Sequence, residues 1–491
     1  MRGVEKRMRN GITPMSRLNK TSGLLIGPVT LEPSPKRRKL RKFERSPKTV
    51  EQPVASIDDL NDDCLERIFK YLPLSSRLIV RMVSRRWRKA SKLAWSNVRA
   101  VNFSESAVWT DLDELPPVFR TNAHIGVILR SCGVYLRKLE LGEPCTYKIL
   151  TLVGEHCINL ERLEVAFERY GERFTTLFSK MERLEYFGMR NIRRNVSGDF
   201  WGNPMTNLKE LHLRGRYFTK DSTIRPSIFS SALETLENLS AITLDGFNID
   251  QEVIALISTR TGLTHLSLAK TYSKDLSSLS QLVNLQHLNL STTPATNDLM
   301  IELTKRCKNL RHLNLNQCQF LSNTGLITLG SLPCLEVLLL NSCGFFVTDS
   351  IFGKLHSLKK LECRGCKNVK DDGIIELLRN APNLGELNLA DTGVSDKVLV
   401  VASQVTRARE NNLDLWVIVN KIVKARWRRR LDYVHSHLLE VNNLTGRCDT
   451  EADTLIETYE GNNLFCNPEL ERLDQLFNNH DGDDSEDDDY P

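Results

Sequence analysis

One pattern of apolar and polar positions, of the form Leu-x-x-Leu-x-Leu, recurs over most of the chain. Its eleven copies begin at Leu136, Leu160, Met181, Leu208, Leu239, Leu263, Leu285, Leu310, Leu335, Leu358 and Leu384. The alternation predicts a short strand in each copy, and the rest of each copy returns as a helix or loop. Because no single copy can bury its own leucines, the copies should stack into a parallel sheet over a continuous core.

The spacing of the copies identifies the class of repeat. All intervals but one fall in the window of about 20–29 residues typical of leucine-rich repeats, and the exception, 31 residues after Leu208, indicates a small insertion around Arg216–Arg225. We therefore expect an α/β leucine-rich-repeat solenoid, a horseshoe with a parallel sheet, over residues 131–410. Cysteines follow several strands, at Cys318, Cys343 and Cys366, and this resembles the cysteine-containing subclass of these repeats.

The third and fifth positions of each copy point away from the leucine core, toward the concave surface. The copy that begins at Met181 places Arg183 and Glu185 there, and early copies generally pair a basic with an acidic residue. The middle copies are neutral, which lowers the cost of desolvation by a partner. We therefore predict that substrate binds at seven residues of the middle copies: His265, His287, Asn289, His312, Asn314, Val337 and Leu339.

Three of these residues are histidines on successive predicted strands, so a zinc site is the alternative interpretation. No carboxylate or thiolate accompanies His265, His287 and His312 in those columns. Metal sites in proteins usually combine such ligands with imidazole. We expect neither a metal nor a cofactor.

A different, helical periodicity precedes the repeats. Asp62 and Asp63 mark the start of a predicted helix that Pro73 ends, and a second amphipathic stretch runs from about Ser75 to Ala90. The ordered set Leu60-Asn61, Ile68-Phe69, Tyr71-Leu72-Pro73-Leu74 and Val83-Ser84-Arg85-Arg86-Trp87 resembles the F-box. Asn61 and Ser84 replace the usual Pro and Cys of that family, and Arg77 stands where Asp is frequent.

The F-box resemblance implies binding of a Skp-type adaptor and, through it, of a cullin-RING ligase. About forty residues of short helices cannot build a self-sufficient core, which agrees with a need for a partner. The alternative is that the same apolar residues only pack against the first repeats. We predict eight adaptor-binding residues: Leu60, Leu65, Ile68, Phe69, Leu72, Leu74, Val83 and Trp87.

The charge of the chain is concentrated at its two ends. Residues 1–50 hold fourteen Lys/Arg and three Glu, whereas Asp481–Asp489 contains seven acidic residues, in a chain of 491 residues with a net charge of +6. We expect residues 1–55 and the acidic tail, 446–491, to be disordered. The compact run Lys36, Arg37, Arg38 and Lys39 predicts a nuclear import signal, with a solvated charge cluster as the alternative.

These segments complete a predicted division of the chain. An F-box over 56–102, a linker over 103–130 and a helical cap over 411–445 flank the repeats. No apolar run is long enough to span a membrane, no secretory signal is visible, and the twelve cysteines fit a reducing compartment. We therefore expect a protein of the nucleus and cytoplasm.

No sequence motif for catalysis is present, such as a phosphate-binding loop, a nucleophile elbow or a zinc-protease helix. Together with this absence, the F-box resemblance implies a non-catalytic substrate receptor of a ubiquitin ligase of the Skp–cullin–F-box type. It would hold an unidentified protein substrate and promote its ubiquitination and degradation by the proteasome. The alternative is a nuclear leucine-rich-repeat scaffold that binds protein or nucleic-acid partners without a ligase role; direct nucleic-acid binding is not the favoured prediction.

Overall fold

The computed structural model describes residues 56–443, except for 105–109, 168–176, 179, 193–205, 216–222, 225–232 and 234. The chain divides into two units, Met1–Asp59 and Leu60–Pro491. The described part of the first unit contains a short 3-10 helix, Ile57–Asp59. The predicted disordered arm, the basic run Lys36–Lys39 and the acidic tail lie outside the described residues.

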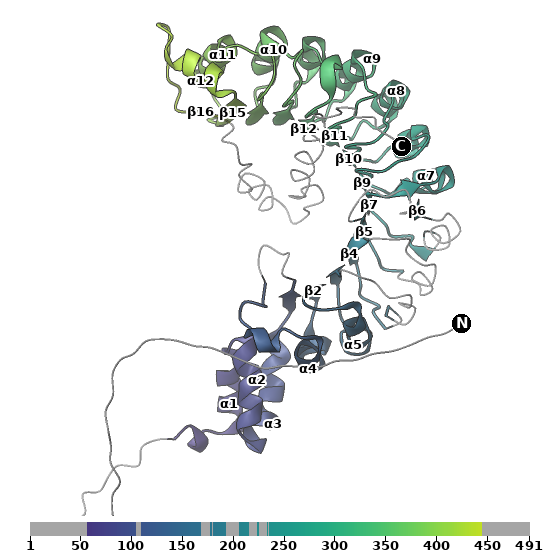
Figure 1. The fold of residues 1–491 in the computed structure, drawn as a ribbon, viewed down its shortest axis with the longest axis vertical. Coiled ribbons are helices and arrows are strands. Elements are labelled where there is room, and N and C mark those ends of the chain that lie inside the picture. Colours follow the sequence, from purple (N-terminus) through teal and green to yellow (C-terminus); the bar gives the residue numbers. More distant parts are fainter. Residues whose placement is uncertain are drawn as a thin grey trace, which may run out of the picture. The chain divides into compact units, whose positions relative to one another are not determined.

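The second unit contains a parallel sheet of fourteen described strands, which line the inner side of the curved solenoid (Figure 1). Each strand pairs in parallel with the next one in the sheet. The predicted leucine-rich-repeat solenoid is thereby confirmed. In order, the strands are β1 (Ala100–Phe103), β2 (Lys138–Gly142), β3 (Arg162–Ala166), β4 (Tyr186–Ile192), β5 (Glu210–Gly215), β7 (Ala241–Asp245), β9 (His265–Ser267), β10 (His287–Asn289), β11 (His312–Asn314), β12 (Val337–Leu339), β13 (Lys360–Glu362), β14 (Glu386–Asn388), β15 (Leu415–Val419) and β16 (Leu439–Asn443).

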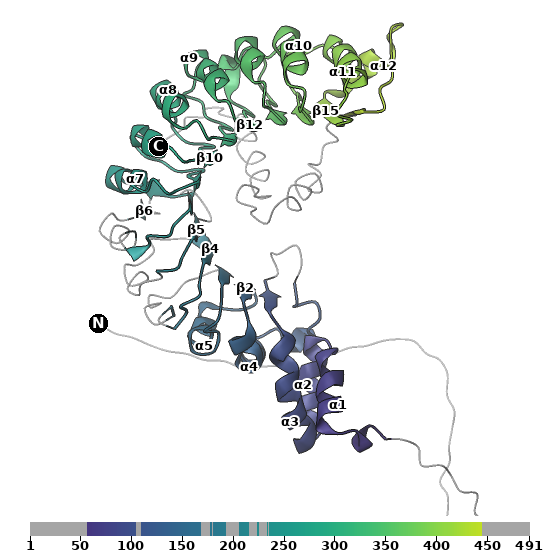
Figure 2. The ribbon, with the colours of Figure 1, turned by 180° about the vertical axis from the view of Figure 1, so that it is seen from behind.

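Helices lie along the outer side of the solenoid, which Figure 2 shows from behind. Polar caps start several of them: the Thr296 hydroxyl, for example, accepts from the amide of Leu299, two residues into α8. The α-helices are α1 (Asp62–Lys70), α2 (Leu74–Val83), α3 (Arg85–Leu93), α4 (Asn122–Cys132), α5 (Leu150–His156), α7 (Gln251–Ser258), α8 (Asn297–Arg306), α9 (Asn323–Leu326), α10 (Asp371–Asn380), α11 (Lys397–Arg407) and α12 (Lys421–Arg428). The 3-10 helices of this unit are η2 (Ala94–Asn97), η3 (Pro117–Phe119), η4 (Gly133–Tyr135), η5 (Tyr147–Ile149), η7 (Ser277–Gln281), η8 (Ile327–Ser331), η9 (Gly344–Phe346) and η10 (Asp349–Lys354).

The consensus leucines form one continuous core between the sheet and the helices. Leu335, Leu338 and Leu340 of the β12 repeat are all buried, and the corresponding residues of neighbouring repeats belong to the same cluster. Two residues after the last consensus position the chain turns in the left-handed region, for example at Gln317 (φ 59°) and Ser342 (φ 54°). The same turn recurring in successive repeats keeps the strands in register.

The predicted inward cysteines connect each repeat to the one before it. The thiols of Cys318, Cys343 and Cys366 are buried and donate to the carbonyls of Leu290, Leu315 and Leu340, at 3.0, 3.0 and 3.1 Å. Burial raises the pKa of Cys318 to about 11. These cysteines therefore act as small apolar residues that also donate a further hydrogen bond to a strand-end carbonyl.

The copy predicted to begin at Met181 is displaced by three residues in the structure. Arg162 pairs with Tyr186, so the repeat begins at Leu184, which is 24 residues from Leu160 and 24 from Leu208. Tyr186 and Gly188 therefore occupy the concave positions, while Arg183 and Glu185 are exposed just before the strand. The sequence was ambiguous because Met181 and Leu184 are both apolar, and both are buried.

The sheet extends beyond 131–410 at both ends. The predicted linker, 103–130, contains most of α4, and β1 just before it pairs with β2. The predicted helical cap, 411–445, does contain α12, but β15 and β16 flank this helix and continue the sheet. Consensus leucines are replaced at inward positions by Val101 and Phe103 in β1, by Val417 and Val419 in β15 and by Val441 in β16, which a search for leucines overlooks. The long interval after Leu208 carries β6 (Thr223–Ile224), which pairs with β8 (Asn248–Ile249).

The cysteine contacts generate a prediction for stability. Replacing Cys343 with Ala removes a buried hydrogen bond and leaves a small void, so the free energy of unfolding should fall by about 1–2 kcal/mol. Urea unfolding followed by circular dichroism measures this loss. Cys334→Ala, at a half-buried cysteine, is the matched control and should change stability by less than about 0.5 kcal/mol. Equal effects of the two changes would show that the thiol contact to Leu315 contributes nothing.

Candidate functional site

Two surfaces are candidates for function, and the first is the three-helix segment α1–α3. The Asn61 side chain accepts from the Cys64 amide at 2.8 Å and begins α1, and the Ser84 hydroxyl accepts from the Trp87 amide at 3.1 Å and begins α3. Ser84 is extended (φ −153°, ψ 167°), so the stretch predicted over Ser75–Ala90 is two helices. The two departures from the F-box pattern, Asn61 and Ser84, are both helix caps.

The third departure, Arg77, is also structural. Its side chain is only 6% exposed, and its guanidinium donates to the carbonyls of Leu72, Ala94 and Lys70 at 2.8, 2.8 and 2.6 Å. Burial lowers the pKa of Arg77 from its usual value. Arg77 thus joins the end of α1 to the end of α3 and satisfies carbonyls that a helix terminus leaves unpaired.

The structure divides the eight predicted adaptor-binding residues into an interior and an exterior group. Leu65 and Phe69 are buried, with Leu60, Leu72 and Trp87 packed around them, while Leu74 belongs to the core of the solenoid. Five of these six therefore pack within the three-helix segment, and only Leu74 packs against the first repeats, as the alternative interpretation expected. Of the eight, Ile68 and Val83 (59% exposed) lie on the surface.

Sequence reasoning missed further exposed apolar side chains on this segment. Ile79 and Met82 stand four and one residues before Val83 on α2, and all three are exposed. Residues three and four apart lie on one side of a helix, so α2 presents an apolar stripe to solvent. On α1, Tyr71 (88% exposed) similarly follows Ile68 by three residues. The spacing of Ile79, Met82 and Val83 by three and four residues was the sequence signal that could have identified this exposed side of α2.

The second surface is the inner face of the sheet, and its first strands carry a charge network. The Arg190 guanidinium pairs with Glu140 and, at 2.8 Å, with Glu164. The Tyr186 hydroxyl donates to Glu164 at 3.2 Å, and Arg162 lies 3.4 Å above the Tyr186 ring. Although burial favours its neutral form, the neighbouring arginines hold the pKa of Glu164 below its usual value. The charges at this end of the face satisfy one another.

The middle of the inner face carries the predicted histidines as a stack. His265, His287 and His312 are Cα partners on adjacent strands, and their successive rings lie 4.0 Å apart and within 12° of parallel. Burial, followed by the neighbouring histidines, lowers the pKa of His287 to about 3, and burial lowers that of His312 to about 4. Because the three ring planes are nearly parallel, their nitrogens do not converge on one point where an ion could bind.

The remaining predicted substrate-binding residues lie beside this stack. Asn289 is buried, and its side chain accepts from the Ser291 amide at 3.0 Å. Half-buried Asn314 accepts in the same way from the Asn316 amide, so both asparagines support the turn after their strand. Val337 and Leu339 on β12 are half-buried and partly available to a ligand. Across the described residues, no group of three or more His, Cys, Asp or Glu is placed to hold a metal ion.

Residues 57–98 match the model of the F-box domain family. The chain is therefore an F-box protein with leucine-rich repeats. The F-box covers α1–α3 together with η2, and the helix caps and Arg77 contacts described above are features of this domain. Among the described residues, the apolar stripe on α2 is exposed to solvent, as are Ile68 and Tyr71.

Other proteins resemble larger parts of the chain at low identity. The Caenorhabditis elegans protein named "Putative RNA-binding protein EEED8.10" is 23% identical over 68% of this chain and 50% of its own length. Tubulin-folding cofactor E of Arabidopsis thaliana is 24% identical over 59% of this chain and 63% of its own. The chain thus spans about half to two thirds of the length of these relatives. A structure of the yeast Rad7 and Elc1 complex matches with 17% identity and a TM-score of 0.43, covering 82% of this chain and all of that one.

Within the described ranges, no helix combines the length and the apolar character needed to cross a bilayer.

The histidine stack predicts a pH dependence of stability. An unfolded histidine titrates near 6.5, whereas the stacked residues stay neutral to much lower pH, so the unfolded state binds protons first. The free energy of unfolding should therefore fall as pH drops from about 6.5 to about 5. In His287→Gln this fall should be smaller, as measured by urea unfolding at several pH values. His356→Gln, an exposed position, should follow the wild type; an unchanged slope in His287→Gln would contradict the account.

Proposed function

We propose that the chain is the substrate-recognition subunit of a ubiquitin ligase of the Skp–cullin–F-box type. The observation that carries this proposal is an F-box with an exposed apolar stripe, built into the same core as a repeat solenoid. Exposed apolar patches mark interaction sites, and a Skp-type adaptor would bury this one. Through the adaptor the chain would reach the cullin.

The shared core favours a receptor that holds its substrate in a defined position. Leu74, Leu78 and Trp95 of the F-box belong to the same buried cluster as Ile125 and Leu139 of the first repeats. A rigid connection keeps a bound protein at a fixed distance from the ligase, which raises the effective concentration of its lysines. The substrate itself would lie on the inner face of the sheet, and its ubiquitination would direct it to the proteasome.

The chemistry of the cysteines supports a role without catalysis. A thioester intermediate needs an accessible thiolate, whereas burial raises the pKa of Cys145 and Cys157 to about 12 and that of Cys307 to about 11. These three thiols are therefore unsuited to form a thioester, whereas Cys64 is exposed. The assignment of ubiquitin transfer to other subunits rests on the F-box resemblance.

A second candidate function is a nuclear scaffold that binds nucleic acid, which the name of the C. elegans relative brings into consideration. The exposed basic residues of α12, including Lys421, Arg426 and Arg428, favour it. It predicts binding to RNA that weakens steeply with salt, whereas the ligase proposal predicts a protein complex that survives nuclease and moderate salt.

The adaptor proposal is tested by a change at the α2 stripe. Ile79→Glu with Val83→Glu places two charges where an adaptor would have to desolvate them, while both side chains are solvent-exposed in the free protein. Affinity for a purified Skp-type adaptor should fall at least about 100-fold, measured by calorimetry. Leu431→Glu, at an exposed leucine beyond α12, is the control and should bind normally. Undiminished binding by the folded double variant would refute the adaptor role of this stripe.

The import signal is proposed on sequence alone. Replacing Lys36, Arg37, Arg38 and Lys39 with Ala removes four of the fourteen basic residues of the first 50, and the fluorescently tagged protein should shift from the nucleus toward the cytoplasm. Replacing Arg2, Lys6, Arg7 and Arg9 instead controls for the loss of charge. Equal distributions of the two variants, measured by imaging, would contradict the assignment.

A further inference from the structure

The C-terminal end of the inner face carries an exposed tryptophan between two glutamates. Glu386, Trp416 and Glu440 are Cα partners on β14, β15 and β16, at the end of the sheet shown in Figure 1. Paired residues of parallel strands point to the same face, and neighbouring strands lie about 4.8 Å apart. Trp416 is 43% exposed, and both glutamates are exposed. An indole ring therefore lies between two accessible carboxylates.

The surrounding surface is acidic. The third and fifth positions of β13–β16 hold three glutamates, one lysine and four uncharged residues: Lys360, Glu362, Glu386, Asn388, Trp416, Ile418, Glu440 and Asn442. The Lys360 ammonium is shared between Glu362 at 2.9 Å and Glu386 at 3.0 Å, so it cannot fully neutralise either. Glu440 accepts from the Asn442 side-chain amide at 3.0 Å, and Lys424 on α12 lies near enough to interact with it electrostatically.

This combination favours a cationic side chain. The face of an indole attracts a guanidinium or ammonium group, and carboxylates accept charge-assisted hydrogen bonds from the same group. At these strand positions three glutamates outnumber one lysine, which disfavours phosphates and acidic peptides there, whereas the basic residues of α12 lie beyond the strand ends. The first strands already contain a cation bound in this way by the chain itself. The Arg162 guanidinium lies over the Tyr186 ring, and the Tyr186 hydroxyl donates to Glu164.

An apolar pair of side chains, Val337 and Leu339, lies on the same face of the sheet as Trp416. Val337 and Leu339 are on β12, three strands before β15, which corresponds to about 14 Å. An extended peptide that crosses the strands covers this distance in about four residues. We propose that the inner face binds an extended substrate segment with an apolar residue at Val337 and Leu339 and, about four residues away, an arginine or lysine at Trp416. This inference rests on the proposed function as a substrate receptor, and it names the class of substrate.

The test uses the full chain in complex with its adaptor, immobilised and incubated with degenerate peptides. Each peptide carries a fixed leucine and, four residues later, Arg, Gln or Glu; a fourth set places the Arg next to the leucine. We expect wild-type protein to recover the Arg set at least about tenfold over the Glu set, with a preference for the four-residue spacing. Trp416→Ala should abolish the preference for Arg, and Glu440→Lys should reverse it toward Glu.

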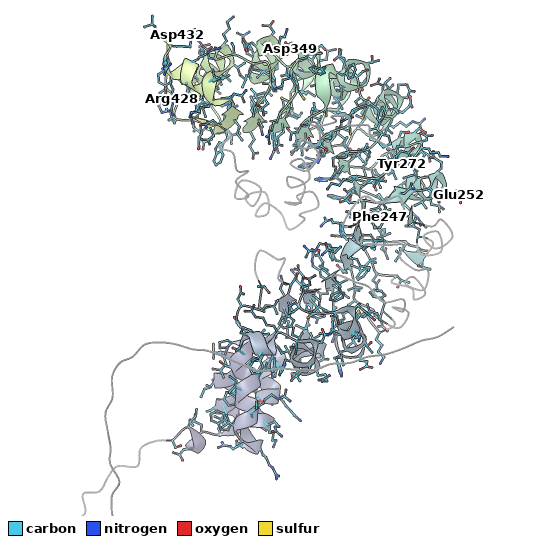
Figure 3. The ribbon with its side chains drawn as sticks, in the orientation of Figure 1. Phe247, Glu252, Tyr272, Asp349, Arg428 and Asp432 are labelled. Carbon is cyan, nitrogen blue, oxygen red and sulfur yellow. The ribbon has the colours of Figure 1, made fainter. Side chains whose placement is uncertain are left out.

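Two control variants test whether the loss of the preference for Arg is specific to Trp416 and Glu440. Phe320→Ala removes another exposed aromatic ring, and Glu252→Lys reverses a charge on the outer helix α7, where Figure 3 labels it. Both should keep the wild-type preference. Equal recovery of Arg and Glu by wild type, or an unchanged preference in Trp416→Ala and Glu440→Lys, would overturn the proposal. Equal recovery of both spacings would overturn the pairing with Val337 and Leu339.

The same samples distinguish this inference from the proposed function. Adaptor retention is measured on the same resin, and neither Trp416 nor Glu440 belongs to the F-box. Loss of adaptor binding with an intact preference for Arg would contradict the ligase proposal and leave the peptide site standing. Normal adaptor binding without any preference for Arg would contradict the site alone.

Discussion

Stacking of repeats on one shared core is the constraint on which the rest of the structure depends. A single repeat exposes its leucines on both sides, so each is stable only because its neighbours cover it. The residues at the inward positions are consequently restricted to apolar types. The cysteine contacts and the left-handed turns recur at the same places in successive repeats. The F-box takes part in this core through Leu74, Leu78 and Trp95. It is therefore continuous with the solenoid, and deleting it would uncover apolar residues of the first repeats.

The same constraint leaves the outward positions of the strands free to vary, and they differ from one end of the sheet to the other. At the first strands, Glu140 and Glu164 are satisfied by Arg190. In the middle, histidine rings cover one another, and toward the end Trp416 lies between Glu386 and Glu440. Recognition requires groups whose interactions are incomplete in the free protein. By this criterion the last strands are better suited to bind a partner than the first.

The repeat pattern made the fold predictable because burial restricts the residues at three positions of every copy. Where the restriction is weaker, the sequence was less informative. Strands β1 and β15 were missed because Val101 and Val417 replace leucine, and β4 was misplaced because Met181 and Leu184 both satisfy the pattern. Only the pairing of Arg162 with Tyr186 decides between them.

The functional surfaces were harder to predict than the fold. A match to the F-box pattern does not distinguish residues that hold the helices together, such as Leu65 and Phe69, from residues that face outward, such as Val83. Helical phase does so for α2, where Ile79 and Met82 follow the same stripe. Departures from a family pattern were also informative once the structure was known, since Asn61, Arg77 and Ser84 each make a specific hydrogen bond.

The central claim is that one molecule joins an adaptor at its F-box to a substrate on its sheet. Proteins retained by the tagged chain while the proteasome is blocked, identified by mass spectrometry, test this most directly when wild type is compared with Asn314→Glu, Leu339→Glu. Both changed side chains lie on the inner face, outside the leucine core. The account predicts that the double variant keeps the adaptor and cullin and loses the proteins that accumulate on wild type. Retention of the same proteins by a folded variant would contradict it.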